Sequence, residues 1–240
     1  KVIKPFEMKI EEAPMPKRGK DEALLKIKYV GICGSDVAIY KGTQPFGSYP
    51  RIPGHEFSAE IVEIDENSKG LKKGMLVTAT PYFNCGKCYA CKCGKTNCCE
   101  DNQTMGVQRD GAFGQYCVVP VSKLYPSNGI PEDLLTLIEP FCISYHAIMR
   151  ANLKKDDTVL IFGAGPIGTF AAVAAKQLGC RVIISDLLES RLKLAGEICD
   201  VETATPDELD RLLSTVNNGG GADVCVEAVG VSGTFLSCIE

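Results

Sequence analysis

The stretch TVLIFGAGPIG, residues 158–168, decides the fold of the second half of this chain. A short apolar run leads directly into a G-x-G-x-x-G turn, which opens an Ala-rich segment with helical spacing. In a dinucleotide-binding turn the first Gly permits a tight bend, the second lets a pyrophosphate approach the backbone, and the third lets helix and strand pack closely. The helix N-terminus that follows offers unpaired N–H groups to the phosphates. The turn therefore predicts a dinucleotide site that includes Gly163, Gly165, Pro166, Ile167 and Gly168.

An acidic residue stands where the ribose of such a cofactor is bound. Asp186 follows the next apolar run, Val182–Ser185, at the spacing typical of a carboxylate that contacts the adenosine ribose. That carboxylate repels the 2′-phosphate of NADP, and Leu187 beside it supplies no cation. We therefore expect NAD rather than NADP, and we include Arg191 among the cofactor-binding residues. A Gly-rich turn without a ligand is the alternative interpretation.

The two parts of the chain differ in their pattern. Apolar runs alternate with helical segments in the second part, which indicates βαβ units around a parallel sheet. There we expect strands at Thr158–Phe162, Val182–Ser185 and Val224–Val229 with a weak element before the last, and helices at Phe141–Arg150, Ile167–Leu178, Leu188–Gly196 and Asp207–Val216. The first part has short β segments between Gly and Pro residues. Its expected strands are Ala23–Ile32, Phe57–Ile64, Met75–Ala79 and Gln115–Val119.

The predicted fold is α/β with a β-rich domain at residues 1–145 and a doubly wound parallel sheet at residues 146–240. A doubly wound sheet has two βαβαβ halves. The expected strands supply little more than one half, so we expect this sheet to be truncated at the C-terminus with an unpaired edge.

Composition excludes several classes of protein. The 240 residues carry a net charge of −4, which gives no electrostatic footprint for nucleic acid or an anionic membrane. No apolar run is long enough to span a bilayer, and no secretory signal pattern opens the chain. The 13 cysteines are odd in number, which favours a cytoplasmic protein with thiolate metal ligands over a disulfide scaffold.

Several cysteines are clustered near the middle of the chain. Cys85, Cys88 and Cys91 have C-x2-C-x2-C spacing, and the adjacent Cys98 and Cys99 follow. Short C-x2-C steps bring thiolates together around Zn²⁺, and four sulfur ligands leave no open position. The pattern predicts a structural zinc site. A redox motif or a nucleic-acid zinc knuckle is a weaker alternative, because acidic residues follow directly.

A second set of potential ligands is dispersed along the chain. Cys33 lies in GICGSD at residues 31–36, His55 in GHE at residues 54–56, and Glu139 precedes a proline. Their spacing alone does not establish a site. The other histidine, His146, lies in an expected helix, and we expect it to pack in the core.

The ordered motifs GICGSD, GHE, the cysteine cluster, IEP at residues 138–140 and GAGPIG resemble the zinc-containing medium-chain alcohol and polyol dehydrogenases. This resemblance covers essentially the whole chain. It implies a GroES-like catalytic domain at 1–145, with a structural zinc lobe at 85–99, and a Rossmann domain at 146–240. In this family the last cysteine of the lobe follows Asn and one variable residue, which selects Cys99 after Asn97. The implied structural ligands are Cys85, Cys88, Cys91 and Cys99.

The resemblance also implies the roles of the dispersed residues. Cys33 and His55 would bind a catalytic zinc, with Glu56 as a ligand or an exchangeable neighbour, and Asp36 would orient His55. Glu139 replaces the second cysteine of the alcohol dehydrogenase site. This replacement resembles the polyol dehydrogenase branch, in which the carboxylate binds zinc directly or through water.

Two further segments, Thr43–Phe46 and Ser48–Arg51, resemble bacterial dehydrogenases of sorbitol and of sugar acids such as L-galactonate and L-gulonate. Gln108 departs from that pattern, which has His there. Arg51 or Arg109 is a candidate to bind a substrate carboxylate. The simpler interpretation of both is a solvated surface arginine.

The implied activity is hydride transfer between a secondary alcohol of a polyol or sugar acid and NAD. Zinc would polarise the substrate hydroxyl, and Ser35 would accept its proton. We expect two zinc ions per chain and a cytoplasmic homo-oligomer, either a dimer or a tetramer. The alternatives are a non-catalytic zinc-binding homologue, a different alcohol dehydrogenase of the family, or a zinc-free quinone reductase, which the intact cysteine motifs disfavour.

Overall fold

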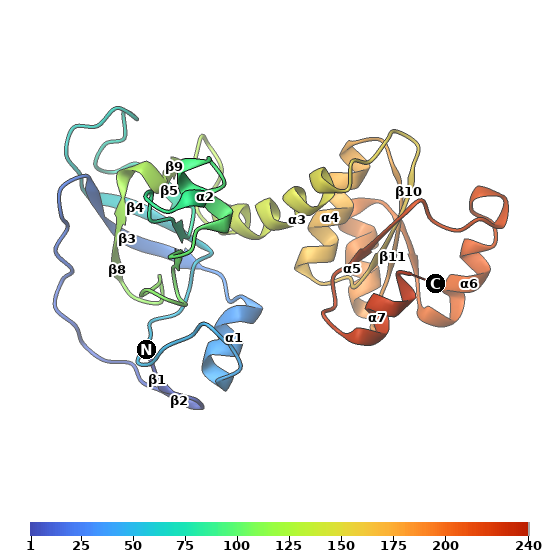
Figure 1. Ribbon diagram of the computed structural model, residues 1–240, viewed down its shortest axis with the longest axis horizontal. Helices are drawn as coiled ribbons and strands as arrows, with labels where there is room; N and C mark the ends of the chain where they lie inside the picture. Colours follow the sequence, from blue (N-terminus) through green and yellow to red (C-terminus); the bar gives the residue numbers. More distant parts are fainter. Residues whose placement is uncertain (240) are drawn as a thin grey trace. The chain divides into compact units, whose positions relative to one another are not determined.

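The computed structural model describes residues 1–239 and divides the chain into two compact units, Lys1–Glu139 and Pro140–Glu240 (Figure 1). The sequence had placed the domain boundary near residue 145. Helix α3, Ile138–Arg150, contains both positions. Pro140, the first residue of the second unit, lies in the first turn of this helix, where a proline is tolerated and does not interrupt the backbone.

Unit 1 is built on a five-stranded antiparallel sheet with strand order β8-β3-β4-β5-β9. Apolar side chains of the sheet, among them Leu25, Phe57, Ile61 and Val77, form one buried cluster. The expected strands are present, with ends that differ by one or two residues. Their bounds are β3 Glu22–Val30, β4 Phe57–Glu63, β5 Leu76–Ala79 and β8 Tyr116–Pro120, and the fifth strand, β9 Leu124–Pro126, was not expected.

The rest of unit 1 outside this sheet forms shorter strands and helices. Helix α1 was not expected, because only two of its residues, Asp36 and Ile39, are buried. The elements are β1 Val2–Lys4, β2 Glu7–Met8, α1 Gly34–Lys41, β6 Tyr82–Phe83, α2 Tyr89–Lys92, η1 Thr96–Cys98, β7 Gln103–Thr104, η2 Val121–Lys123 and η3 Leu134–Leu137.

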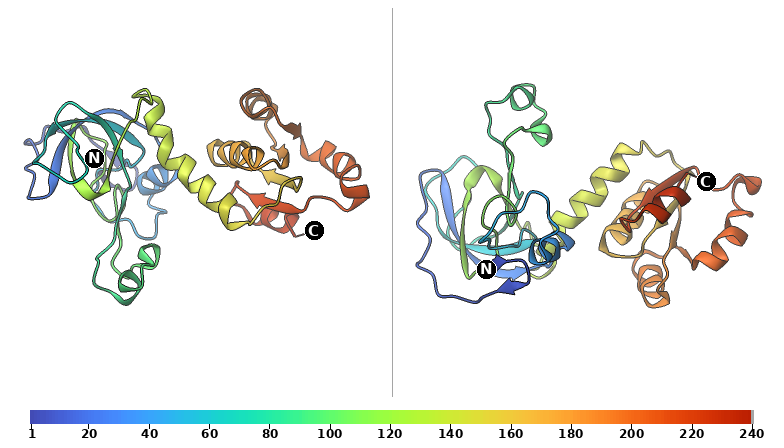
Figure 2. Two further views of the ribbon diagram at one scale, coloured as in Figure 1. Left: turned by 90° about the horizontal axis from the view of Figure 1, so that it is seen from above. Right: turned by 60° about the horizontal axis from the view of Figure 1, so that its bottom comes forward.

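The cysteine-rich lobe of unit 1 projects from the sheet. It lies between β6 and β7, which pair through only Tyr82 with Thr104 and Phe83 with Gln103. Neither α2 nor η1 buries a residue. Figure 2 shows this green segment extending away from the sheet in both views. Little apolar packing therefore fixes the conformation of the lobe.

Unit 2 contains a parallel sheet with strand order β12-β11-β10-β13. Side chains of β10 alternate between two apolar clusters, since Val159 and Ile161 contact one cluster and Leu160 contacts the other. Helices therefore cover both faces, as in a doubly wound fold. The bounds are β10 Thr158–Phe162, α4 Pro166–Gln177, β11 Arg181–Ser185, α5 Glu189–Cys199, β12 Glu202–Ala204, α6 Pro206–Leu213, η4 Asn217–Gly219, β13 Val224–Glu227 and α7 Ser232–Ser237.

The carboxyl ends of the parallel strands position the Gly-rich turn. That turn joins β10 to α4, and Gly163 N donates a hydrogen bond to Ser185 O at the end of β11.

Within residues 1–239, none of the helices is both long and apolar enough to cross a membrane.

Candidate active site and metal centres

Three potential metal ligands from separate segments of unit 1 converge. One ligand atom each from Cys33, His55 and Glu56 lies within 4.8 Å of the other two. Cys33 is the N-cap of α1, and the other two residues directly precede β4. A thiolate, an imidazole and a carboxylate are a donor set that zinc binds in catalytic sites, where a fourth position stays open. The arrangement therefore fits zinc.

Asp36 joins the two segments that carry these ligands. Its Oδ2 accepts a hydrogen bond from Cys33 N at 2.9 Å, and its Oδ1 accepts one from Gly54 N at 2.8 Å. The same Oδ1 lies 3.8 Å from His55 Nδ1. The buried carboxylate thus lies beside His55, where the sequence had expected it, and it also fixes the backbone next to two ligands.

His55 lies in negatively charged surroundings. Its Nδ1 is buried, and no hydrogen-bond partner for it exists in the described chain. Burial lowers the pKa of His55, but its hydrogen bond with Cys33 and the charges of Asp36 and Glu139 outweigh burial and raise that pKa to about 9. Such surroundings favour a cation at the cluster.

Gly31 leaves space for the Glu56 side chain. A Cβ at Gly31 would lie 2.4 Å from Glu56 Oε2, closer than any non-bonded contact allows. The Gly31 N–H donates to Glu56 O at 2.6 Å. The first Gly of the GICGSD motif therefore lets the Glu56 carboxylate reach the cluster.

Glu139 lies beside the three-residue cluster. It is buried in the first turn of α3, and its charge acts on His55, but within the described residues the converging set contains Glu56 and not Glu139. Burial raises the pKa of Glu139. The Tyr82 hydroxyl donates to Glu139 Oε1 at 3.4 Å. No sequence motif marks Tyr82, so its place next to Glu139 could not be expected.

Tyr82 remains a hydrogen-bond donor over a wide pH range. Burial and the neighbouring Glu139 charge raise the pKa of Tyr82 to about 12. Ser35, the expected proton acceptor, is half-buried in the first turn of α1, two residues after Cys33.

The four cysteines selected for the lobe also converge. Their Sγ atoms all lie within 4.8 Å of one another, whereas Cys98 is exposed and outside the set. Backbone N–H groups point at the sulfurs: Cys85 N lies 3.2 Å from Cys99 Sγ, and Cys91 N lies 3.5 Å from Cys88 Sγ. The Cys91 N–H lowers the pKa of Cys88 to about 6. The set fits a closed tetrahedral zinc site.

A polar chain connects this lobe to the rest of unit 1. Asn84 Nδ2 lies 3.7 Å from Cys91 Sγ, and Lys123 Nζ donates to Asn84 Oδ1 at 3.1 Å. Lys123 lies in η2, so it places a positive charge near the four sulfurs. Neither residue belongs to a spaced motif, so neither could be expected from the sequence.

In the Gly-rich turn of unit 2, two glycines are required by the fold of the chain, and a third leaves space beside the backbone. Gly163 has φ of +103°, and a Cβ at Gly168 would lie 1.8 Å from Gly163 O. The chain itself therefore requires these two glycines. At Gly165, by contrast, an added Cβ would meet no atom within 4 Å. This open space fits a ligand that approaches the backbone at the N-terminus of α4, which begins with Pro166 and Ile167.

Asp186 is part of the same turn. Its Oδ2 accepts from Ala164 N at 2.8 Å, and its Oδ1 accepts from Leu188 N at 2.9 Å. Arg191 Nη1 lies 3.7 Å from Asp186 Oδ2. The expected cofactor residues are thus brought together at the ends of β10 and β11.

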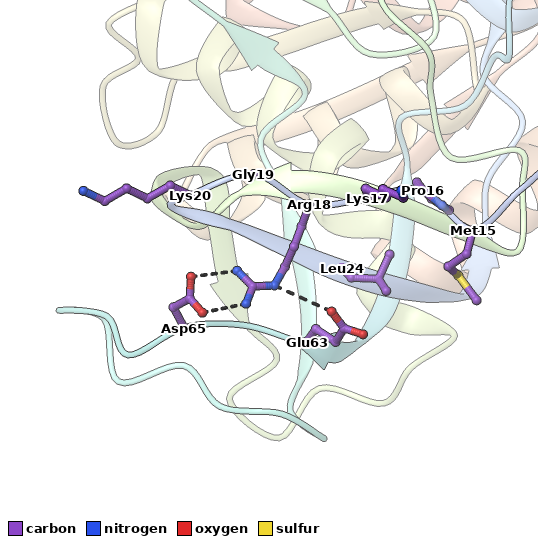
Figure 3. A pocket seen from close by; sticks show the side chains of 9 residues that line it. All are labelled: Met15, Pro16, Lys17, Arg18, Gly19, Lys20, Leu24, Glu63 and Asp65. Carbon is purple, nitrogen blue, oxygen red and sulfur yellow. Dashed lines mark hydrogen bonds and ion pairs between the residues drawn. The ribbon is translucent and has the colours of Figure 1, made fainter.

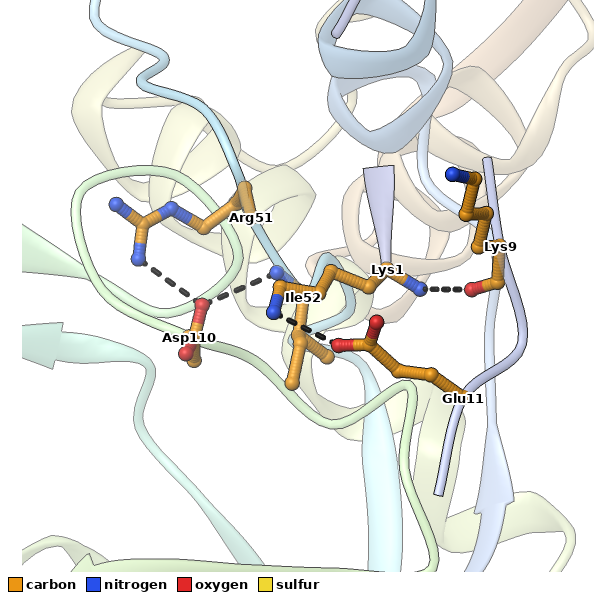
Figure 4. Close-up of polar contacts among 6 residues, drawn as sticks. All are labelled: Lys1, Lys9, Glu11, Arg51, Ile52 and Asp110. Carbon is orange, nitrogen blue, oxygen red and sulfur yellow. Dashed lines mark hydrogen bonds and ion pairs between the residues drawn. The ribbon is translucent and has the colours of Figure 1, made fainter. Parts of the chain in front are cut away.

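The structure corrects two expectations about basic residues. His146 is exposed rather than in the core, because Ser144 and Ile148 occupy the inward face of α3. Arg51 is not a solvated arginine available to a substrate: its Nη1 bonds Asp110 at 3.1 Å (Figure 4). Its Nη2 bonds Ser48 Oγ at 2.6 Å.

Arg109 also has a partner within the protein. Its guanidinium lies 3.9 Å from the centre of the Phe83 ring. A cation held over an aromatic face is stabilised by the ring quadrupole. Arg51 is therefore not a free carboxylate-binding group, and Arg109 lies over an aromatic ring.

A surface hollow elsewhere in unit 1 contains none of the predicted site residues (Figure 3). Its central Arg18 is bound by both carboxylate oxygens of Asp65, at 2.6 and 2.7 Å, and lies 3.7 Å from Glu63. These charges neutralise one another, so we do not assign this hollow a role in the chemistry. Its lining consists of Met15, Pro16, Lys17, Arg18, Gly19, Lys20, Leu24, Glu63 and Asp65.

Comparisons with known proteins agree with this architecture. Residues 19–132 match the alcohol dehydrogenase GroES-like domain. The chain is 42% identical over 224 residues to L-galactonate-5-dehydrogenase of Escherichia coli K12, covering 92% of this chain and 65% of that protein. It is 39% identical over 227 residues to sorbitol dehydrogenase of Halalkalibacterium halodurans, covering 92% and 66%.

A solved structure is similar over the same extent. An alcohol dehydrogenase of Escherichia coli CFT073 in complex with NADH superposes with a TM-score of 0.85 and 32% identity, covering 95% of this chain and 68% of that one. The chain spans about two thirds of the length of the curated relatives it matches.

Proposed function

Since the chain belongs to the zinc-containing medium-chain alcohol and polyol dehydrogenase family, we propose that the full-length protein transfers a hydride between a secondary alcohol and NAD. The substrate proposed is a polyol or a sugar acid. The observation that carries this proposal is the convergence of Cys33, His55 and Glu56 within 4.8 Å. A non-catalytic zinc-binding homologue would not require this open donor set.

The residues of unit 1 would hold two zinc ions. Cys33, His55 and Glu56 fit the catalytic ion, with Glu139 beside them, and the four lobe cysteines fit a structural ion. In such an open site zinc supplies Lewis-acid chemistry, which lowers the pKa of a bound hydroxyl.

The chain itself would orient the substrate and remove its proton. Asp36 holds the Cys33 and Gly54 backbones, which preorganises the cluster before the substrate binds. Ser35, two residues from Cys33, is the proposed acceptor of the hydroxyl proton. His55 and Glu139 are buried, which limits the access of water to these two side chains.

NAD is the proposed hydride acceptor, bound by unit 2. Gly165 leaves space for the pyrophosphate, and Asp186 offers its carboxylate to the ribose. Arg191 Nη1 lies 3.7 Å from Asp186 Oδ2, so its charge is paired with that carboxylate. The relative solved with NADH supports this class of cofactor.

A polyhydroxylated substrate is supported by Glu139, which stands where the alcohol dehydrogenase site has a second cysteine. The relatives named for L-galactonate and sorbitol support the same class. Because Arg51 is paired with Asp110, the sugar-acid subclass depends on those relatives and not on that arginine.

We also propose a cellular location and an oligomeric state for the enzyme. A cytoplasmic location is proposed because cysteine thiolates that serve as metal ligands persist in a reducing compartment. A homo-oligomer, either a dimer or a tetramer, remains a prediction that sedimentation of the full-length protein would test.

The decisive experiment measures NAD reduction by the full-length protein with hexonates, polyols and ethanol. We expect oxidation of a hexonate or polyol, and we expect His55→Ala to abolish it while the circular dichroism spectrum is retained. His146→Ala is the matched control, because His146 is exposed on α3, and its activity should be unchanged. A fully active His55→Ala variant, or ethanol oxidised much faster than every polyol, would contradict the proposal.

A further inference from the structure

Glu139 depends on a single donor for its position. It is 9% exposed, and in the described part of the chain the Tyr82 hydroxyl is the only group that donates a hydrogen bond to its carboxylate. The two residues are 57 positions apart, so folding and not local sequence brings them together. A buried carboxylate with one donor is poorly fixed unless that donor is retained.

The position of Tyr82 is itself determined by the fold. In β6 the neighbouring Phe83 points into the apolar core, so the Tyr82 side chain lies on the other face of the strand. Pairing of β6 with β7 holds Tyr82 opposite Thr104. The phenol therefore reaches Glu139 from a strand whose backbone is paired with β7 and whose next residue is buried in the core.

The 3.4 Å contact is longer than an O–H···O hydrogen bond of ordinary strength. It restrains the carboxylate without holding it rigidly. Glu139 therefore lies near His55, on whose pKa its charge acts, but outside the set of three converging ligands.

We propose that Tyr82 is a positioning residue that acts through Glu139, because its hydroxyl holds this carboxylate next to the Cys33–His55–Glu56 cluster. This inference rests on the proposed function, which supplies the reaction that Glu139 would assist. Tyr82 itself forms no bond to the substrate in this role.

A double-mutant cycle tests the proposal in the full-length zinc enzyme. Tyr82→Phe removes only the hydroxyl, and we expect kcat to fall by about three- to tenfold, within the range for one lost hydrogen bond, with KM changed less than about twofold. In a Glu139→Gln background the same substitution should have almost no further effect, because the partner through which Tyr82 acts has been changed.

Tyr29→Phe is the matched control. Tyr29 is a comparably exposed tyrosine on β3, at 48% against 42% for Tyr82, and its substitution should change neither kinetic parameter. If Tyr82→Phe matched Tyr29→Phe, or if its full effect persisted in the Glu139→Gln background, the proposal would be overturned. The second result would indicate direct contact of Tyr82 with substrate.

A spectroscopic measurement separates this inference from the proposed function. When Co²⁺ replaces the ion at the Cys33–His55–Glu56 cluster, its visible absorption reports the surrounding ligands. We expect Tyr82→Phe to shift that spectrum and Tyr29→Phe to leave it unchanged. In the Glu139→Gln background, adding Tyr82→Phe should cause no further shift. A protein that oxidised no polyol but showed this pattern would refute the proposed function alone. An unshifted Tyr82→Phe spectrum, or no Co²⁺ at this cluster, would refute the positioning role.

Discussion

Replacement of Asp36 offers a graded test of how the open site is held together. Its carboxylate accepts from Cys33 N at 2.9 Å and from Gly54 N at 2.8 Å, and the residue is 5% exposed. Asp36→Ala leaves the buried Gly54 N–H and the partly buried Cys33 N–H without a partner. Each unpaired buried donor costs about 1–3 kcal/mol, so the free energy of unfolding should fall by about 2–6 kcal/mol.

Asp36→Asn should have an intermediate effect. The amide keeps one oxygen acceptor but presents an NH₂ group to the second donor, so we expect a loss of about half that of Asp36→Ala. The control is Asp210→Ala in α6, where the aspartate is exposed and the change should remain within about 0.5 kcal/mol.

The assay is urea unfolding of the full-length protein at fixed zinc concentration, followed by circular dichroism. Zinc content is measured for each variant, because loss of the catalytic ion would lower stability separately. If Asp36→Ala were as stable as Asp210→Ala, the two hydrogen bonds that Asp36 accepts from the backbone would not stabilise this site.

Three further predictions follow from the two metal sets and the cofactor turn. Cys88→Ser should lower the melting temperature and reduce bound zinc from two ions per chain towards one, since structural zinc contributes directly to folding; an unchanged metal content would contradict the closed site. Gly165→Ala should weaken NADH binding in a fluorescence titration with little loss of stability, whereas Gly168→Ala, whose Cβ would lie 1.8 Å from Gly163 O, should destabilise unit 2; the reverse order would refute our interpretation of the turn. Because of Asp186, kcat/KM should be higher with NAD than with NADP, and a preference for NADP would count against the ribose contact.

Features encoded by nearby residues were predictable from the sequence. The turn at residues 163–168 and the strand before it form one continuous motif, and the parallel sheet of unit 2 follows from the same alternation. The choice of Cys99 over Cys98 came from resemblance, and the structure places Cys99 with the other three sulfurs.

Features that depend on distant packing were not predictable. Tyr82 and Glu139, or Arg51 and Asp110, meet across more than fifty residues without a shared motif. His146 was assigned to the core from its residue type, but the burial of Ser144 and Ile148 defines which face of α3 points inward. The sequence also left open which acid joins the ligands, because that choice depends on the space beside Gly31.

The weak attachment of the cysteine lobe has a consequence for engineering. Its short helices bury no side chain, and a ladder of two residue pairs connects it to unit 1. Its shape can therefore depend on four sulfur atoms and not on a hydrophobic interior. Insertions in the longer segment between Cys91 and Cys99 should be tolerated as long as the sulfurs can still meet, because long surface loops add little closure entropy. The lobe is thus a suitable position at which to graft a foreign peptide or a reporter group without repacking the sheet.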